Sequence, residues 1–146
     1  MELLIQQLVN GLAVGSIYAL IALGYTMVYG TIKLINFAHG DVYMMGAFIG
    51  YFAVMVLKLN VFLALLVAMV ACAILGVVIE RVAYRPLRKS TRVAALITAI
   101  GVSYLLENAM SYFFGAESRP FPSDFGTETF TLFGDVSVNG KQILIF

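Results

Sequence analysis

VFLALLVAMVACAILGVVI, residues 61–79, is an apolar run that contains no charged residue. As an α-helix, 19 residues reach close to the ~30 Å thickness of a bilayer's hydrocarbon core. The run follows directly after Asn60, a residue type favoured at helix N-caps. This stretch therefore predicts a membrane-spanning helix, and it sets the class of fold for the chain around it.

The composition of the whole chain supports a lipid environment. Of the 146 residues, 62% are hydrophobic and only 12% are charged, and the mean hydropathy is +0.96. A soluble domain keeps about a quarter of its residues charged. The net charge of +1, without a basic stripe interleaved with aromatics, does not indicate nucleic-acid binding. We therefore expect an integral membrane protein.

Three further apolar stretches lie before and after residues 61–79. The N-terminal one, 3–30, would reach roughly 42 Å as one helix. Because Glu2 rather than a basic segment precedes it, we interpret it as a true span and not a signal peptide. The second, 42–57, would reach only ~24 Å, which is short for a span. The last, 93–115, has cap candidates at Ser90 and Thr91. The predicted fold is an all-α, polytopic transmembrane helical bundle over residues 1–115, with about four spans.

A basic segment between the third and fourth spans gives the orientation. Residues 80–92 contain one acid and five bases: Arg81, Arg85, Arg88, Lys89 and Arg92. The positive-inside rule puts this segment in the cytoplasm, and counting back puts the N-terminus outside. The sharper alternative is that these bases also dock a cytoplasmic partner.

The segment 116–142 is polar and slightly acidic, which is typical of a periplasmic loop. Apolar and polar residues alternate over 127–132 and 136–138, and Asn139-Gly140 is a tight-turn dipeptide. We expect a small β-hairpin-like element here. Residues 143–146 begin another apolar run, which we interpret as the start of a truncated next span.

Small residues recur every four positions on three of the spans, and such a stripe lets helix backbones approach closely. Chance in an Ala- and Gly-rich chain is the alternative for any single pair. The predicted packing positions are Gly11, Gly15, Gly46, Gly50, Ala64, Ala68, Cys72 and Gly76.

TIKLINFAHGD, residues 31–41, joins two apolar stretches. The one before it, 3–30, is longer than a bilayer crossing needs, and the one after it, 42–57, is shorter. We expect a discontinuous helix that unwinds near 36–40 and restarts at Asp41, because such breaks let backbone groups face a polar cavity. Gly40 supplies backbone freedom and Asp41 a cap. The alternative is an ordinary cytoplasmic turn in which His39 is solvated.

Other chemistry is not indicated. Glu107 lies either deep in the fourth span or, as we favour, near the outer headgroups. Cys72, the only cysteine, lacks neighbours for a disulfide or a metal site. No catalytic pair, metal cluster or phosphate-binding loop is recognisable, so we expect no enzyme activity, no cofactor and no metal in this chain.

Two blocks carry a family resemblance. GLAVGSIYALIALGYTMVYGTIKLINFAHGDVYMMGAF, residues 11–48, and IERVAYRPLRKSTRVAALITAIGVSYLLEN, residues 79–108, resemble the N-terminal part of the permease subunits of branched-chain amino-acid ABC importers. The blocks separate this family poorly from urea and short-chain amide permeases, which remain the alternative.

The resemblance implies a substrate and partners. The substrate would be leucine, isoleucine or valine, delivered by a periplasmic binding protein to a permease in the bacterial inner membrane. A second homologous permease chain and two cytoplasmic ATPase subunits would complete the importer. Family members are longer, so the other alternative is a non-transporting truncated fragment.

A zwitterionic substrate needs protein dipoles in place of water around both its charges. NFAHG, residues 36–40, resembles the family's broken-helix element. The predicted pathway residues are Asn36, His39, Gly40, Asp41, Asn10 and Ser16.

Overall fold

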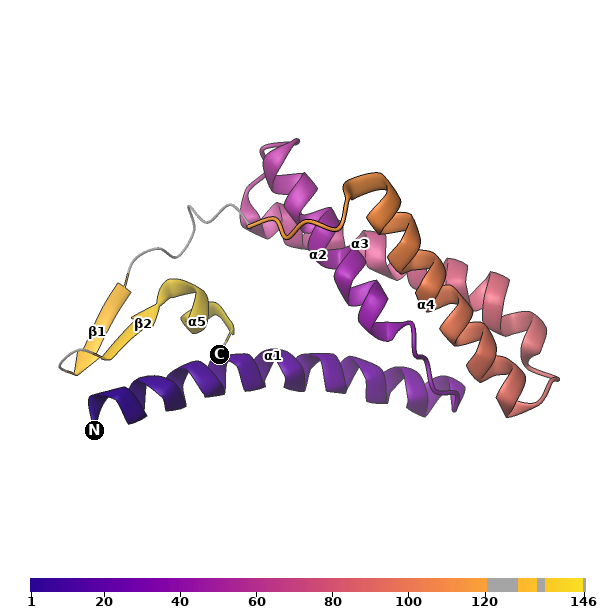
Figure 1. Ribbon diagram of the computed structural model, residues 1–146, viewed down its shortest axis with the longest axis horizontal. Helices are drawn as coiled ribbons and strands as arrows, with labels where there is room; N and C mark the ends of the chain where they lie inside the picture. The colour runs from indigo at the N-terminus through magenta and orange to yellow at the C-terminus, as the bar shows by residue number, and fades with distance from the viewer. Residues whose placement is uncertain (121–128, 134–135, 146) are drawn as a thin grey trace. The chain divides into compact units, whose positions relative to one another are not determined.

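The computed structural model describes residues 1–120, 129–133 and 136–145. These residues form five α-helices, two short helical segments of other types and two strands (Figure 1). In chain order the elements are α1 (Glu2–Ile32), α2 (His39–Met55), α3 (Val61–Ile79), η1 (Glu80–Tyr84), η2 (Arg85–Leu87), α4 (Arg92–Phe114), β1 (Thr129–Phe133), β2 (Val136–Asn139) and α5 (Gly140–Ile145). The predicted polytopic helical fold is confirmed.

The chain divides into two compact units. One contains Met1–Gly24 and Ser123–Phe146, and the other contains Tyr25–Pro122. The second unit holds the last turns of α1 together with α2, α3, η1, η2 and α4, and all the helix packing described below belongs to it.

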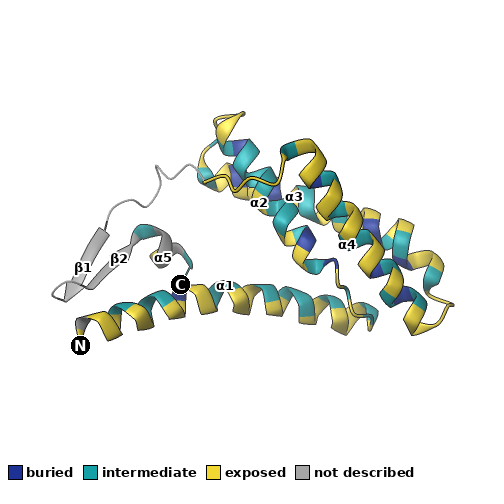
Figure 2. Cartoon of the chain, in the orientation of Figure 1, coloured by how far each residue is buried: buried dark blue, intermediate teal, exposed yellow. Residues whose placement is uncertain are grey.

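Among the described residues, three helical stretches are long and apolar enough to cross a membrane: Leu3–Ile32, Val61–Leu87 and Arg92–Phe114. Most of their large apolar residues are exposed, and these residues are coloured yellow on the ribbon in Figure 2. Such surface is stable in lipid rather than in water. The remaining predicted span, α2, is a helix of 17 residues, so its crossing of the bilayer stays a prediction.

The helix that begins with α3 continues beyond the predicted boundary. Residues 80–92 were expected to be a loop, but η1 is a π-helical turn and η2 a 3₁₀ turn that carry the helix on to Leu87. The basic residues therefore lie on helical turns, and only 88–91 connect to α4. The segment stays helical because Tyr84 is buried against other helices, and Pro86, which lacks an N–H, lies where the helix ends.

The buried core lies where α2, the α3–η1 junction and α4 meet. Ile79, Tyr84 and Ala99 form its centre. Partly buried apolar side chains pack around them: Val42, Leu75, Ala83, Val102 and Leu106. Figure 2 shows dark blue, buried segments on α2, α3 and α4. This core supports the end of the molecule that carries the helix break.

Small residues allow α2 and α3 to pack closely. Ala64 and Ala68 on α3 are buried. A Cβ added at Gly46 would lie 2.9 Å from Cys72 Sγ, so the two backbones approach at this point. The other predicted packing glycines have open space beside them within this chain: Gly11, Gly15, Gly50 and Gly76.

Aromatic rings join α2 to the end of α4. Phe114 lies 5.7 Å from Phe48 and 4.7 Å from Phe52, measured between ring centroids. Gly115 follows with φ of +78°, a conformation that glycine adopts without a steric penalty. The helix therefore ends directly after this aromatic contact.

The predicted β-hairpin is present. β1 and β2 pair antiparallel, with Thr129 opposite Asn139 and a register irregularity between Thr131 and Phe133. The connection at 134–135 and the predicted strand positions 127–128 lie outside the described residues. Asn139-Gly140, predicted as the tight turn, instead ends β2 and begins α5. Residue 146 of the predicted further span also lies outside the described residues.

Candidate functional site at the helix break

The break between α1 and α2 covers residues 33–38, slightly before the predicted 36–40. Lys33 ends α1 with φ of +56°, and its N–H donates to Tyr29 O at 2.7 Å. A residue in this left-handed region is a common way to end a helix. Ala38 occupies the N-cap position of α2, and its carbonyl accepts from Val42 N at 3.0 Å. His39 and Gly40 are therefore already helical, and Asp41 lies within the first turn rather than at the cap.

Asn36 organises the break. Its Oδ1 accepts two hydrogen bonds, one from the Tyr84 hydroxyl at 2.7 Å and one from the Ala38 N–H at 3.1 Å. Its backbone carbonyl accepts from His39 N at 3.2 Å. Two donors on one amide atom identify that atom as the oxygen, so the other amide atom of Asn36, Nδ2, is a hydrogen-bond donor.

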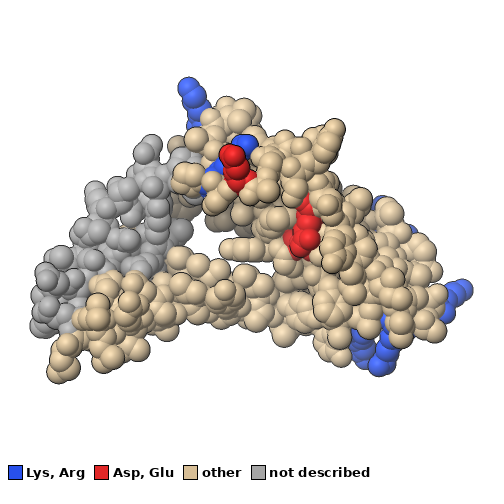
Figure 3. Space-filling view, in the orientation of Figure 1, with Lys and Arg blue, Asp and Glu red and all other residues tan. Residues whose placement is uncertain are grey.

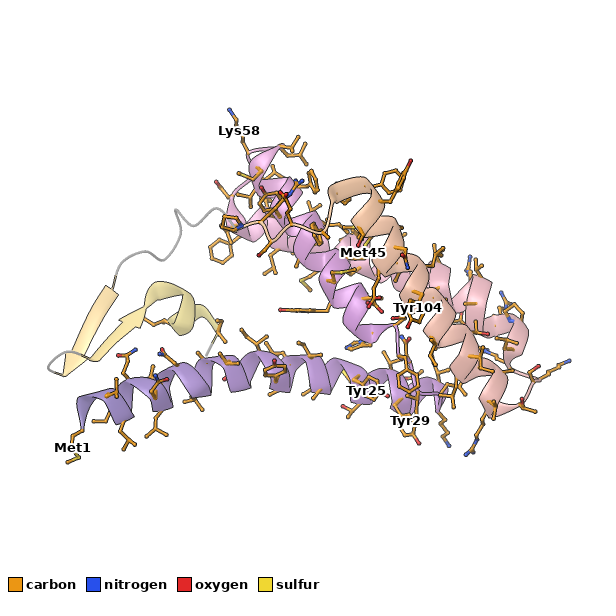
Figure 4. The ribbon with its side chains drawn as sticks, in the orientation of Figure 1. Met1, Tyr25, Tyr29, Met45, Lys58 and Tyr104 are labelled. Atoms are coloured by element: carbon orange, nitrogen blue, oxygen red, sulfur yellow. The ribbon has the colours of Figure 1, made fainter. Side chains whose placement is uncertain are left out.

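His39 begins α2 and contacts α1. Its ring lies edge-on to the ring of Tyr25, with the centroids 5.8 Å apart. Figure 4 shows Tyr25 near the end of α1, one turn before Tyr29. His39 is half-buried and the neighbouring Ala38 is fully buried, so the two helices meet closely at the break.

Asp41 is the one charged residue that is buried among the described residues. In the first turn of α2 its carboxylate lies near the positive end of the helix dipole. Burying an acid inside a membrane protein costs free energy, so such a residue is a candidate for a role in binding or transport. Gly40, beside it, is exposed, and a Cβ there would meet nothing.

Asn10 and Ser16 make local hydrogen bonds within α1. Gln6 Nε2 donates to Asn10 Oδ1 at 3.2 Å, and Ser16 Oγ donates to Leu12 O at 2.8 Å. Both residues belong to the unit that contains Met1–Gly24, whereas the break belongs to the unit Tyr25–Pro122.

Tyr84 is the residue of this cluster that the sequence reasoning missed. It lies among arginines in a segment predicted to be a loop, so its burial was not expected. A signal was available, because Ile79, Ala83 and Leu87 repeat at the four-residue spacing of a helix face. That periodicity indicates a helix that continues beyond Glu80.

The basic residues from Arg81 to Arg92 that were singled out are all exposed. Arg88 pairs with Glu80, with 2.5 Å between Nη2 and Oε1. Glu107 is exposed on α4, and the neighbouring Asn108 donates to Tyr104 O at 2.7 Å. Within the described residues, no group of three His, Cys, Asp or Glu side chains could hold a metal ion.

These features, a discontinuous helix with a buried acid in a lipid-exposed bundle, are typical of transporters. Residues 7–146 match the model of the family described as branched-chain amino acid transport system / permease component. The chain belongs to this permease family. It is a multi-pass protein of the bacterial inner membrane.

Named relatives agree. The chain is 48% identical to the high-affinity branched-chain amino acid transport system permease protein BraD of Pseudomonas aeruginosa, over 97% of this chain and 50% of BraD. It is 46% identical to LivH of Escherichia coli and to LivH of Salmonella typhimurium, which carry the same description, over 83% of this chain and 42% of each. The chain thus spans about half the length of these relatives. No solved structure matches it.

Proposed function

We propose that the chain forms part of the permease subunit of an ATP-driven importer that moves branched-chain amino acids across the inner membrane. The observation that carries this proposal is the family match over residues 7–146, with relatives named for branched-chain amino acid transport at 46–48% identity. The helix break supports a role in the pathway itself.

The break supplies the chemistry that a zwitterionic substrate needs. Moving an amino acid through lipid requires protein groups that replace the water around its carboxylate and its ammonium. The Asn36 amide N–H groups are suited to the carboxylate, and the buried Asp41 carboxylate is suited to the ammonium. His39 and its contact with Tyr25 hold α2 against α1 at this point.

Partner chains supply the remaining functions in this proposal. ATP hydrolysis resides in two separate cytoplasmic subunits, a second homologous permease chain completes the pathway, and a periplasmic protein delivers the substrate. The exposed basic face on η1, η2 and the following turn, with Arg81, Arg85 and Lys89, is available to cytoplasmic partners.

Uptake of labelled substrate tests the proposal. A strain that lacks the gene is compared with the same strain after the intact gene has been restored, with leucine and urea as the two substrates. Restoration should increase leucine uptake and leave urea uptake unchanged.

Restored uptake of urea without leucine would replace the proposal with an amide or urea permease. Restoration of neither, with the protein present in the membrane, would favour a non-transporting chain.

A further inference from the structure

An open pocket of about 570 Å³ lies where α1 ends and α4 begins. Three basic residues from separate positions line it: Lys33, Arg88 and Arg92. Three hydroxyl residues line it as well: Thr31, Ser90 and Thr91. Figure 3 shows basic side chains, in blue, gathered at the end of the helical unit where α1 stops. The pocket lies within the unit Tyr25–Pro122 and includes neither Asn36 nor Asp41.

The charges in this pocket are unbalanced. Arg88 pairs with Glu80, but within the described part of the chain no acid forms an ion pair with Lys33 or Arg92. Ser90 and Thr91 add hydroxyl groups that can donate. Thr91 Oγ1 accepts from Ala94 N, which leaves its own O–H available as a donor. The first N–H groups of α4 add partial positive charge at the same place. Such a donor set favours an anion with several oxygen acceptors.

Four of the ten lining residues are apolar. Ile32, Leu34, Leu87 and Ala95 complete the lining, and the two flanking helices, α1 and α4, are ones that can cross a membrane. A free inorganic anion has no apolar surface to pack against these residues, whereas a phospholipid carries its phosphate next to a glycerol and acyl chains. Basic pockets between membrane helices on the cytoplasmic side bind anionic lipid headgroups in this manner.

We propose that this pocket binds the phosphate of an anionic phospholipid in the cytoplasmic leaflet, through Lys33 and Arg92. The site depends on α1 and α4 crossing the membrane and not on which solute is transported. Bound lipid would tie the end of α1 to the start of α4 beside the break.

Binding of acyl-labelled phosphatidylglycerol tests the site. Fluorescence polarisation with the purified protein in phosphatidylcholine nanodiscs gives the affinity. Each charge removed, by Lys33→Gln or Arg92→Gln, should weaken binding about fivefold, and the double variant about thirtyfold. The charge-conserving pair Lys33→Arg and Arg92→Lys should restore most of the affinity, and circular dichroism verifies that each variant is folded.

Two matched controls distinguish a pocket from a generally basic surface. Lys58 also follows a helix with positive φ, +50°, but lies outside the pocket at the tip labelled in Figure 4. Arg81 lies on the same basic segment as Arg88 and does not line the pocket. Lys58→Gln and Arg81→Gln should each leave the affinity unchanged.

Three results would overturn the proposal. One is an unchanged affinity in the folded double variant. Another is a loss in Arg81→Gln or Lys58→Gln equal to that in Arg92→Gln, because that indicates diffuse charge attraction. The third is displacement of the lipid by inorganic phosphate at millimolar concentration, because the pocket would then bind free phosphate rather than lipid.

Discussion

At the scale of single residues, Asn36 links the break to η1 and to the start of α2. Its side-chain oxygen binds the hydroxyl of Tyr84 and the N–H of Ala38, the N-cap residue of α2. Tyr84 is almost fully buried, so its hydroxyl has little access to other partners. A buried polar group that loses its partner costs more than an ordinary hydrogen bond is worth.

Substitutions at this pair should therefore differ in their effect on stability. Tyr84→Phe keeps the ring in the core and removes one hydrogen bond, which should lower the free energy of unfolding by about 1 kcal/mol. Asn36→Ala leaves the Tyr84 hydroxyl and the Ala38 N–H unpaired, and should cost about 2–3 kcal/mol. Unfolding in a denaturing detergent, followed by circular dichroism, measures both.

Tyr104→Phe is the control, because Tyr104 is exposed on α4, and it should change little. Equal costs for Tyr84→Phe and Tyr104→Phe would contradict the assigned hydrogen bond.

At the scale of elements, the contact between α2 and α3 depends on the absence of a side chain at Gly46. An added Cβ would lie 2.9 Å from Cys72 Sγ, closer than atoms in a packed interior approach. The thiol is itself held, because Cys72 Sγ lies 3.6 Å from the Val42 carbonyl that it donates to.

Gly46→Ala should therefore lower the free energy of unfolding by about 1–3 kcal/mol through overpacking. Combining it with Cys72→Ala removes Sγ and should recover most of the loss. Gly50→Ala, one turn along the same helix with open space around it, should be neutral or stabilising. A loss in Gly50→Ala as large as that in Gly46→Ala would show that the glycines matter for another reason.

Local sequence predicts the helices well where charge or polarity marks their ends. Asn60 and Glu80 flank the apolar run, and α3 has the predicted bounds Val61–Ile79. The extension through η1 was missed because long-range packing of Tyr84 outweighs the four basic side chains around it. The break was predicted from span lengths, but its position depends on Lys33, whose left-handed backbone has no signature in the sequence.

The candidate site was only partly predictable for the same reason. Asn36, His39 and Asp41 follow from one short segment whose polarity is unusual between two spans. Tyr84 is 48 residues away from Asn36 in the chain, and no local pattern connects the two. The pocket lined by Lys33 and Arg92 likewise depends on tertiary structure.

At the scale of the whole molecule, the pocket between the end of α1 and the start of α4 bears on orientation. These two helix ends line one pocket, so they belong on one side of the membrane. The same arrangement follows if α1 and α3 both run inward and the basic segment is cytoplasmic. Which side of the membrane that is, and with it the predicted outside N-terminus, stays a prediction.

Cysteine labelling measures this orientation in intact cells. In a Cys72→Ala background, a membrane-impermeant maleimide should label a cysteine at position 58 and leave one at position 89 unlabelled until the cells are opened. Lys58 and Lys89 are both exposed, so burial does not decide the result. The reverse labelling pattern would invert the topology.

The most direct test of the central claim, that the break forms part of an amino-acid pathway, is the initial rate of labelled-leucine uptake by the intact transporter carrying Asp41→Asn. The amide preserves the shape of the side chain and removes the buried charge. Because a hydrogen bond to a charged group is worth about 1.5–3 kcal/mol, uptake should fall about tenfold or more at equal amounts of transporter. Glu107→Gln, which neutralises an exposed acid on α4, should leave the rate unchanged. Wild-type uptake in Asp41→Asn, or an equal loss in Glu107→Gln, would contradict this account.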